Sequence, residues 1–197
     1  MRKLLIATTN RDKVREILPI LSGLPFEFLT LADCPELTAP DETGRTFADN
    51  ARAKAIYYAT ATGELAVAED SGLEIDALGG QPGVESARYA GVESSYPEKF
   101  ARIYAGLRAV GGEASPARFV CAAAVAKGSR LLFETEGVVN GRIAPEPRGS
   151  GGFGYDPIFF YPPFGTTLAD AGDRKHAVSH RAAAMRRVAE FLDQYEG

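Results

Sequence analysis

The chain has 197 residues, of which 22 are Lys or Arg and 26 are Asp or Glu, so its formal net charge at pH 7 is −4. Its 45% hydrophobic and 24% charged residues are typical of a globular protein, which excludes a disordered tail, a collagen-like repeat and a coiled coil. A chain of this length buries roughly 70% of its unfolded surface, enough for one large domain or two lobes that share a sheet. Without a basic excess, binding to a nucleic-acid polymer is not expected.

The cysteines and the apolar runs indicate a reduced, non-membrane compartment. Cys34 and Cys121 form no C-x-x-C pair, so the sequence offers neither a disulfide framework nor a zinc site. Cys121 lies in an apolar run over 119–125, which predicts a small buried side chain. The first residues lack the long apolar region of a signal peptide, and no apolar run is long enough to cross a bilayer. We therefore expect a cytoplasmic protein.

Strands and helices are expected to alternate in the first half of the chain. Asn10 can cap a helix whose apolar residues recur on one face, and Thr46-x-x-Asp49 resembles a capping box. The polar run 69–72 interrupts apolar residues and is typical of a turn. The expected order is a strand at 4–7, a helix from 11, a strand at 26–31, a loop at 32–45, a helix from 46 to about 61, and strand pieces at 65–68 and 73–75.

In the second half, consecutive strands are expected. Pro97 suits the first turn of a helix. The turn at 127–130 separates two apolar segments and predicts a hairpin. The expected elements are a helix from 97 to about 110, hairpin strands at 118–126 and 131–139, a strand at 158–160 and a final helix at 179–195. Alternation followed by consecutive strands favours an α/β fold with a mixed sheet flanked by helices.

One apparent nucleotide motif is rejected. Gly149-x-Gly151-x-x-Gly154 formally matches the dinucleotide fingerprint, but that fingerprint needs a helix to begin at once so that its amides hold the pyrophosphate. Here Asp156-Pro157 and a strand-like aromatic run follow. The sequence also contains no G-x-x-x-x-G-K-[ST] loop and no G-x-S-x-G elbow, so Walker-type and serine-hydrolase chemistry are unsupported.

The first strand–loop–helix is a candidate anion site. Thr8, Thr9 and Asn10 offer polar donors where a helix N-terminus presents unpaired N–H groups, and Lys13 follows about one turn later. A capped surface helix with a solvated lysine would have the same sequence, so this motif alone does not decide.

Acidic residues after the third strand are a candidate metal site. The neighbouring carboxylates of Glu69 and Asp70 repel one another unless a cation neutralises them, and Ser71 adds another oxygen. Glu42, in a polar loop, can supply a further carboxylate. Oxygen ligands without sulfur suit Mg²⁺ or Mn²⁺. A solvated turn that ends at Gly72 is the alternative.

Three further groups of residues are suggestive without being decisive. Asn50 and Lys54 lie one helical turn apart and face the same way, although a lysine in this position usually faces solvent. The segment Phe153-Gly154-Tyr155-Asp156 combines aromatic rings with an acid, which fits either a shelf for a nucleobase or an anchored loop. Lys175, His180 and Arg181 place donors before and at the start of the last helix, where a cap with surface charges is the alternative.

Taken together, these segments resemble the inosine triphosphate pyrophosphatase family, hydrolases of non-standard purine nucleoside triphosphates. The match spans residues 8 to 181 in the order of the family's motifs, and it departs from them at Glu69, His176 and Ala182. The matching segments are Thr8-Thr9-Asn10-x-x-Lys13-x-x-Glu16, Glu42-Thr43-Gly44-x-Thr46-Phe47-x-x-Asn50-Ala51-x-x-Lys54-Ala55, Ala68-Glu69-Asp70-Ser71-Gly72-Leu73, Gly80-x-Pro82-Gly83-Val84-x-Ser86-Ala87-Arg88-Tyr89-Ala90-Gly91, Gly152-Phe153-Gly154-Tyr155-Asp156-Pro157-Ile158-Phe159, and Lys175 with Ser179-His180-Arg181.

The resemblance implies a single domain with a curved mixed sheet, two lobes, a nucleotide cleft between them, and a homodimer. It implies Mg²⁺-dependent cleavage of ITP, dITP and XTP between the α and β phosphates, with Mn²⁺ as a possible substitute. Rejection of GTP is also expected only from the resemblance, because guanine carries the same oxygen at position six as hypoxanthine and xanthine. A related pyrophosphatase with another base preference, or a nucleotide-binding regulator without catalysis, stays an alternative.

Within this resemblance each candidate residue receives a role. Asp70 is the expected general base and a metal ligand, Glu42 is the second metal carboxylate, and Glu69 is a weaker candidate. The remaining roles are phosphate binding by Thr8, Thr9, Asn10, Lys13, Lys54 and Ser71, stacking by Phe153, further substrate contacts by Gly154, Tyr155 and Asp156, and base-side contacts by Lys175, His180 and Arg181. Donors on the base side favour a purine with an acceptor oxygen at position six over adenine, which carries an amino group there.

Overall fold

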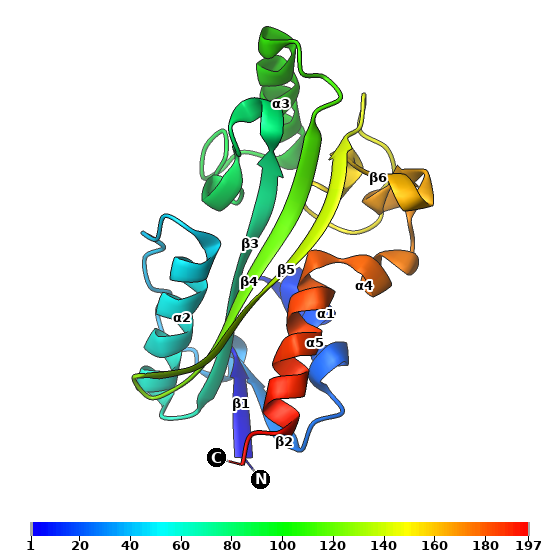
Figure 1. Ribbon diagram of the computed structural model, residues 1–197. Coiled ribbons are helices and arrows are strands. Elements are labelled where there is room, and N and C mark those ends of the chain that lie inside the picture. Colours follow the sequence, from blue (N-terminus) through cyan, green and yellow to red (C-terminus); the bar gives the residue numbers. More distant parts are fainter. Residues whose placement is uncertain (1, 197) are drawn as a thin grey trace. The chain divides into compact units, whose positions relative to one another are not determined.

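The computed structural model describes residues 2–196 and shows an α/β protein (Figure 1). Its helices and strands follow the expected order. The strands are β1 (Arg2–Ile6), β2 (Phe26–Thr30), β3 (Leu65–Ile75), β4 (Pro116–Lys127), β5 (Arg130–Ile143), β6 (Phe159–Tyr161) and β7 (Thr166–Thr167). The α-helices are α1 (Arg11–Leu21), α2 (Phe47–Thr62), α3 (Tyr96–Val110), α4 (Arg174–Val178) and α5 (His180–Asp193).

The strands form one seven-stranded sheet in the order β2-β1-β3-β4-β5-β6-β7. Strand β1 pairs in parallel with both β2 and β3, whereas β6 pairs antiparallel with β5 and β7. The parallel pairs come from the half of the chain where helices connect the strands, as βαβ crossovers require. The prediction of a mixed α/β sheet with flanking helices is therefore confirmed.

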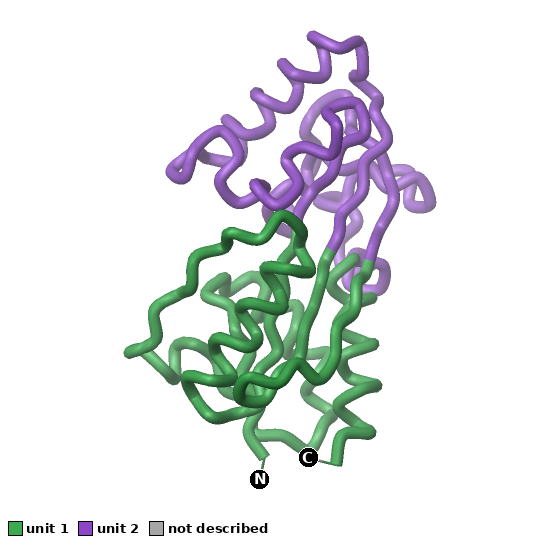
Figure 2. Tube along the Cα trace, turned by 60° about the vertical axis from the view of Figure 1, so that its left-hand side comes forward, with its two compact units in different colours: residues 1–71, 121–137, 180–197 green, residues 72–120, 138–179 purple. Residues whose placement is uncertain are grey.

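The chain divides into two compact units (Figure 2). Unit 1 contains residues 1–71, 121–137 and 180–197, and unit 2 contains residues 72–120 and 138–179. Each unit has its own apolar core. In unit 1 the core includes Leu4, Ile17, Val67 and Met185, which are at most 2% exposed and come from β1, α1, β3 and α5. In unit 2 the core includes Ile75, Ile103 and Phe159.

Local helix signals are confirmed where the sequence carries cap residues. The Asn10 side chain accepts hydrogen bonds from the backbone of Asp12 and Lys13 and starts α1. The Thr46 hydroxyl accepts from the Asp49 amide and starts α2. Helix α3 begins with a capping box between Ser95 and Glu98, one residue before the expected start at Pro97.

The expected interruption between strand pieces at 65–68 and 73–75 is wrong, and so is the alternative of a solvated turn at 69–72. Strand β3 runs without a break from Leu65 to Ile75, so Glu69, Asp70 and Ser71 are strand residues. Both carboxylates are buried, with exposed fractions of 2% for Glu69 and 6% for Asp70. Acidic residues look like a turn in the sequence because burial of an unpaired charge is costly, but long-range partners compensate them here.

Elsewhere the expected β-structure is confirmed. Strands β4 and β5 are neighbours in the sheet and are joined through Gly128 and Ser129, as the hairpin prediction requires. After Gly154 the chain enters a 3₁₀ turn and then β6, so the glycine-rich segment has no following α-helix to bind a pyrophosphate. Among residues 2–196, every helix is too short or too polar to cross a membrane.

Candidate active site

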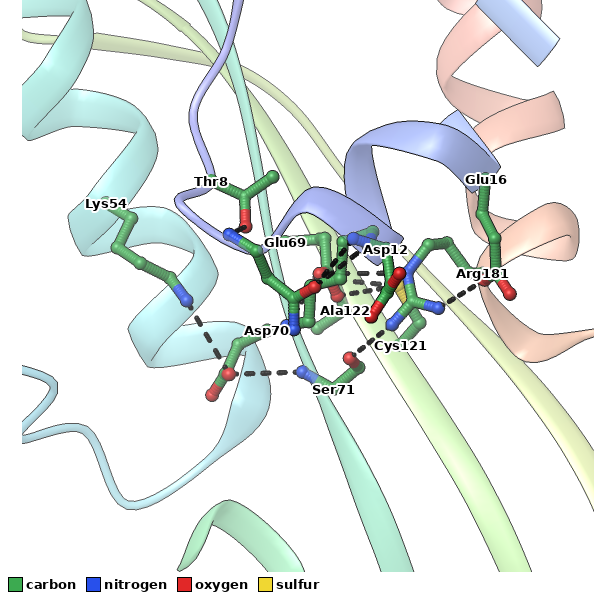
Figure 3. A network of polar contacts seen from close by, with 12 residues as sticks. Thr8, Asp12, Glu16, Lys54, Glu69, Asp70, Ser71, Cys121, Ala122 and Arg181 are labelled. Atoms are coloured by element: carbon green, nitrogen blue, oxygen red, sulfur yellow. Dashed lines mark hydrogen bonds and ion pairs between the residues drawn. The ribbon is translucent and has the colours of Figure 1, made fainter. Parts of the chain in front are cut away.

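Strand β3 places its two acidic residues toward different helices of unit 1. Successive side chains of a strand point to opposite faces, so Glu69 and Asp70 cannot share one set of partners. Asp70 faces α2, where Lys54 approaches it, while Glu69 lies among residues of α1, β4 and α5 (Figure 3). The alternation separates the two carboxylates that the sequence interpretation treated as a joint metal site.

Asp70 is held by donors from α2 and from its own strand. The Asn50 side-chain amide donates to Asp70 Oδ2 at 2.9 Å, and the Ser71 amide donates to Oδ1 at 3.1 Å. Lys54 Nζ lies 3.6 Å from Oδ1. Burial raises the pKa of Asp70 above its ordinary value, against the opposing effects of Lys54 and Asn50. A buried, oriented carboxylate of this kind is suited to accept a proton.

Lys54 brings Glu42 and Asp70 together. Its Nζ donates to Glu42 Oε1 at 2.6 Å and approaches Asp70 at 3.6 Å. Although burial disfavours the ammonium, the carboxylates of Asp70, Glu69 and Glu42 raise the pKa of Lys54 above its ordinary value. Lys54 is therefore a cation at this site, and it does not face solvent freely as the alternative interpretation assumed.

The donor set of Glu42 and Asp70 fits Mg²⁺. This ion is commonly bound through one or two carboxylates, with substrate phosphate and water as the other ligands. Within residues 2–196 no three His, Cys, Asp or Glu side chains gather as a metal-ion cluster. A metal ion bound by Glu42 and Asp70 stays a prediction of the sequence.

The loop that carries Glu42 is fixed through Gly44. The Gly44 amide donates to Asn50 Oδ1 at 2.7 Å, and the same Asn50 side chain donates to Asp70. A Cβ atom at Gly44 would lie 2.5 Å from Asn50 Oδ1 and 2.8 Å from Asp49 Cβ, which leaves no room for a side chain. Asn50 therefore couples the position of the Glu42 loop to that of Asp70.

Gly44→Ala is expected to displace this loop and to weaken the binding of Mg²⁺ that the sequence predicts at Glu42 and Asp70. The added methyl group must push the backbone away from α2, and Glu42 moves with it. We expect the Mg²⁺ concentration that gives half-maximal activity to rise roughly tenfold, as for other residues that orient metal ligands. Gly23→Ala is the control, because a Cβ at Gly23 would meet nothing within 4 Å. An unchanged Mg²⁺ dependence in Gly44→Ala would contradict this role of the loop.

On the other side of β3, Glu69 is the centre of a buried ion cluster. Lys13 Nζ lies 2.7 Å from Glu69 Oε1, Arg181 Nε lies 3.7 Å from the same oxygen, and Cys121 Sγ lies 3.4 Å from Oε2. Although burial opposes ionisation, Lys13 and Arg181 hold the pKa of Glu69 far below its usual range. Cys121 is fully buried as expected, and burial raises the pKa of its thiol.

The N-terminus of α1 presents donors close to this cluster. Thr8 Oγ1 accepts from the backbone amide of Asn10 at 3.2 Å, and Asn10 Oδ1 caps the helix. Because this oxygen is used by the cap, the side-chain nitrogen of Asn10 is the donor that the residue can offer to a phosphate. Thr9 and Asn10 are exposed, whereas the Lys13 side chain is only 17% exposed. The cap is confirmed, and the idea of a solvated lysine is wrong because Lys13 pairs with Glu69.

In unit 2, Asp156 organises the segment that was expected to bind a nucleobase. Its Oδ2 accepts from the Phe153 amide at 2.9 Å and from Lys175 Nζ at 2.6 Å. Asp156 and Lys175 are 2% and 4% exposed. Lys175 Nζ also lies 4.7 Å from the centre of the Phe153 ring, a cation–π distance. A Cβ at Gly152 would lie 2.1 Å from Asp156 Oδ2, so only glycine permits this arrangement.

Tyr155 has a packing role in the same unit. Its ring meets Tyr96 edge-on with the ring centroids 5.4 Å apart, and its hydroxyl donates to the Ser86 carbonyl at 2.8 Å. Tyr155 is 4% exposed, and burial raises the pKa of its hydroxyl. Contact between Tyr155 and a substrate stays a prediction, whereas its anchoring of the Phe153–Asp156 segment is observed.

Known proteins of similar sequence and structure identify the family. The family model described as Ham1 family matches residues 4–191. The chain belongs to the Ham1 family. A dITP/XTP pyrophosphatase of Geobacter sulfurreducens is 43% identical over 193 residues, which cover 98% of this chain and 97% of that protein. One of Geobacillus kaustophilus is 42% identical over 198 residues, with coverages of 100% and 97%. A HAM1 protein from Coxiella burnetii has a TM-score of 0.92 at 36% identity, with coverages of 99% and 100%.

For this Ham1 family member the structure sorts the candidate residues between the two units. The resemblance found in the sequence is confirmed, and unit 1 contains the residues expected at the phosphates and the metal, together with His180 and Arg181, which are 6% and 2% exposed. In full, unit 1 holds Thr8, Thr9, Asn10, Lys13, Glu42, Lys54, Asp70, Ser71, His180 and Arg181, and unit 2 holds Phe153, Gly154, Tyr155, Asp156 and Lys175.

Sequence reasoning underestimated Asn50 and assigned no role to Glu16. Asn50 is 2% exposed and contacts Asp70, and its spacing of one turn from Lys54 was the available signal. Glu16 accepts from Arg181 NH1 at 2.5 Å, across 165 residues of chain. No spacing rule reveals a pair so distant, although both residues lie in segments that match the family's motifs.

Proposed function

We propose that this Ham1 family protein hydrolyses non-standard purine nucleoside triphosphates, namely XTP, dITP and ITP, to the nucleoside monophosphate and pyrophosphate. The observation that carries the proposal is the constellation of Asp70, Lys54 and Glu42 on β3, α2 and the preceding loop. It combines an oriented carboxylate, a half-buried cation and a second carboxylate, with both carboxylates within 3.6 Å of the lysine nitrogen. The names of the relatives support the choice of substrate.

The charges of unit 1 suit a triphosphate. Such a ligand carries about four negative charges, and Lys13 and Lys54 place fixed cations on both sides of β3. The N-terminus of α1 and the Ser71 hydroxyl add neutral donors. These groups would hold the phosphate oxygens in place before the reaction, so little reorganisation is needed as charge develops on the leaving group.

In the proposed reaction, Asp70 accepts a proton from a water molecule that attacks the α-phosphorus. The bond from water oxygen to phosphorus forms, the bond from the α-phosphorus to the bridging oxygen breaks, and pyrophosphate leaves with the electron pair. Asn50 and the Ser71 amide fix the Asp70 carboxylate for this step. Mg²⁺, held by Glu42 and Asp70, would supply charge neutralisation for the phosphate oxygens, and Mn²⁺ is a possible substitute.

The base would be recognised through unit 2. Phe153 offers an aromatic face for stacking, and Lys175 is a buried donor beside it. A donor in a dry site is satisfied by the oxygen at position six of xanthine or hypoxanthine and left unpaired by the amino group of adenine. A homodimer and a cytoplasmic location stay predictions of the sequence; light scattering on the purified protein tests the first.

The substrate preference is tested with a panel of XTP, dITP, ITP, GTP, ATP and dUTP at fixed Mg²⁺. We expect kcat/KM for XTP and dITP to exceed that for ATP by roughly 10² or more, because a buried donor rejects an unsuitable partner strongly. Removal of divalent metal with a chelator should abolish activity, and added Mg²⁺ or Mn²⁺ should restore it. Equal rates for all nucleotides would contradict the purine specificity, and a higher rate for dUTP would indicate a relative with another base preference.

A further inference from the structure

We infer that Glu69 and Arg181 are positioning residues for the phosphate site, Glu69 through Lys13 and Arg181 through Ser71, and that Glu69 is not a metal ligand. The inference rests on the proposed function in that it takes Lys13 and Ser71 as phosphate ligands. It assigns a role to the buried ion cluster of Lys13, Glu16, Glu69 and Arg181, which the reaction itself does not use.

Lys13 is the member of this cluster that extends toward solvent. Its side chain is 17% exposed, against 1% for Glu69, 2% for Arg181 and 8% for Glu16. The ammonium of Lys13 has three donor hydrogens, and its ion pair with Glu69 Oε1, at 2.7 Å, lies on one side of it. Glu69 therefore holds Lys13 in one orientation and leaves donors that can meet a phosphate oxygen. A lysine side chain without such a partner is mobile, and it loses conformational entropy when it binds a phosphate. The pairing with Glu69 orders Lys13 beforehand and reduces this cost.

Arg181 has the corresponding relation to Ser71. Its guanidinium donates to Glu16 Oε2 at 2.5 Å and to Ser71 Oγ at 2.8 Å (Figure 3). Arginine has no acceptor, so Ser71 Oγ must accept in this bond and its own hydrogen is directed elsewhere. The contact thus makes Ser71 a donor, which is the character a phosphate ligand needs.

The charges of the cluster balance. Lys13 and Arg181 contribute two positive charges, and Glu16 and Glu69 contribute two negative charges. A buried ion cluster is often no more stabilising than apolar residues of similar volume, so stability alone does not account for this one. Glu69 also points away from Glu42 and Asp70 and already has Lys13, Arg181 and Cys121 around it, which argues against its role as a metal ligand.

A double-mutant cycle of Lys13→Met and Glu69→Gln tests the inference with inorganic triphosphate as the probe, by calorimetry, and with XTP in activity assays. We expect Glu69→Gln to raise both the Kd of triphosphate and the KM for XTP roughly tenfold, because contacting residues are energetically coupled. In the Lys13→Met background the same change should alter either constant less than about twofold. The Mg²⁺ concentration for half-maximal activity should not move with Glu69→Gln and should rise with Glu42→Gln.

An equal effect of Glu69→Gln in both backgrounds, or a shifted Mg²⁺ dependence, would overturn the inference. Should Glu69→Gln fail to fold, Glu69→Asp takes its place in the cycle; it keeps the charge with a shorter reach, and it should raise Kd only when Lys13 is present. The calorimetric readout is independent of activity. Coupled binding without pyrophosphate release from XTP would therefore count against the proposed function and leave the inference standing.

Discussion

Asp70→Asn is expected to lower the rate of pyrophosphate release from XTP by about 10³-fold, within the range for loss of a general base. Asparagine has nearly the same shape, and its one oxygen can accept either from Asn50 Nδ2 or from the Ser71 amide, which bind different oxygens of Asp70. One side-chain hydrogen bond is lost, but the backbone pairing of β3 should persist. The substitution removes the group that accepts the proton. It also removes one negative charge that a metal ion would contact. Stopped-time assays of pyrophosphate give the rate.

Nucleotide binding separates this result from simple damage to the site. We expect the Kd of XTP in the presence of Ca²⁺ or Mg²⁺ to change far less than kcat, since the cations Lys13 and Lys54 remain. Asp76→Asn is the matched control, because it makes the same change at an exposed position just after β3 and should leave kcat unaltered. An Asp70→Asn protein with substantial turnover would refute the assignment of the base.

Arg181→Met is expected to destabilise the protein by about 3–5 kcal/mol at pH 8, the usual cost of removing one partner from a buried ion pair. Arg181 is 2% exposed, forms an ion pair with Glu16 and lies near Glu69. Its loss therefore leaves these two buried carboxylates with less positive charge around them. Urea unfolding of the variant and the wild-type protein measures the difference. Arg15→Met is the control; its pair with Asp12 is exposed, and the change should be within about 0.5 kcal/mol.

The cost of Arg181→Met should depend on pH with a definite sign. In the wild-type protein the pKa of Glu69 is lowered by Lys13 and Arg181, so its contribution to stability is present above its unfolded pKa and is lost as the pH falls. Without Arg181 the folded pKa of Glu69 rises, and protonation then relieves the buried charge. We expect a larger destabilisation at pH 8 than at pH 5. A cost that is equal at both pH values would argue against an electrostatic role.

Local chemistry made much of the fold predictable. Asn10, Thr46 and Ser95 with Glu98 start helices through contacts with residues two or three positions away, and such signals can be recognised in the sequence. The two-residue turn through Gly128 and Ser129 is equally local. The start of these elements therefore follows from short-range hydrogen bonding. The spacing of their apolar residues then indicates whether each is a helix or a strand.

The character of β3 could not be predicted in the same way. Glu69 and Asp70 look like a polar turn because their compensating partners are distant in sequence: Lys13 on α1, Cys121 on β4, Asn50 and Lys54 on α2, and Arg181 on α5. Only the folded arrangement shows that the strand directs Asp70 toward Lys54 and Glu69 toward Lys13. The family motifs identified these residues as important without revealing that division of roles.

The central claim is that the unit 1 site directs water to the α-phosphorus of a non-standard purine nucleoside triphosphate. Hydrolysis of XTP in ¹⁸O-labelled water with Mg²⁺, followed by mass spectrometry of the products, tests it most directly. We expect xanthosine monophosphate and pyrophosphate, with the label in the monophosphate. Label in pyrophosphate, or release of orthophosphate and the nucleoside diphosphate, would contradict it.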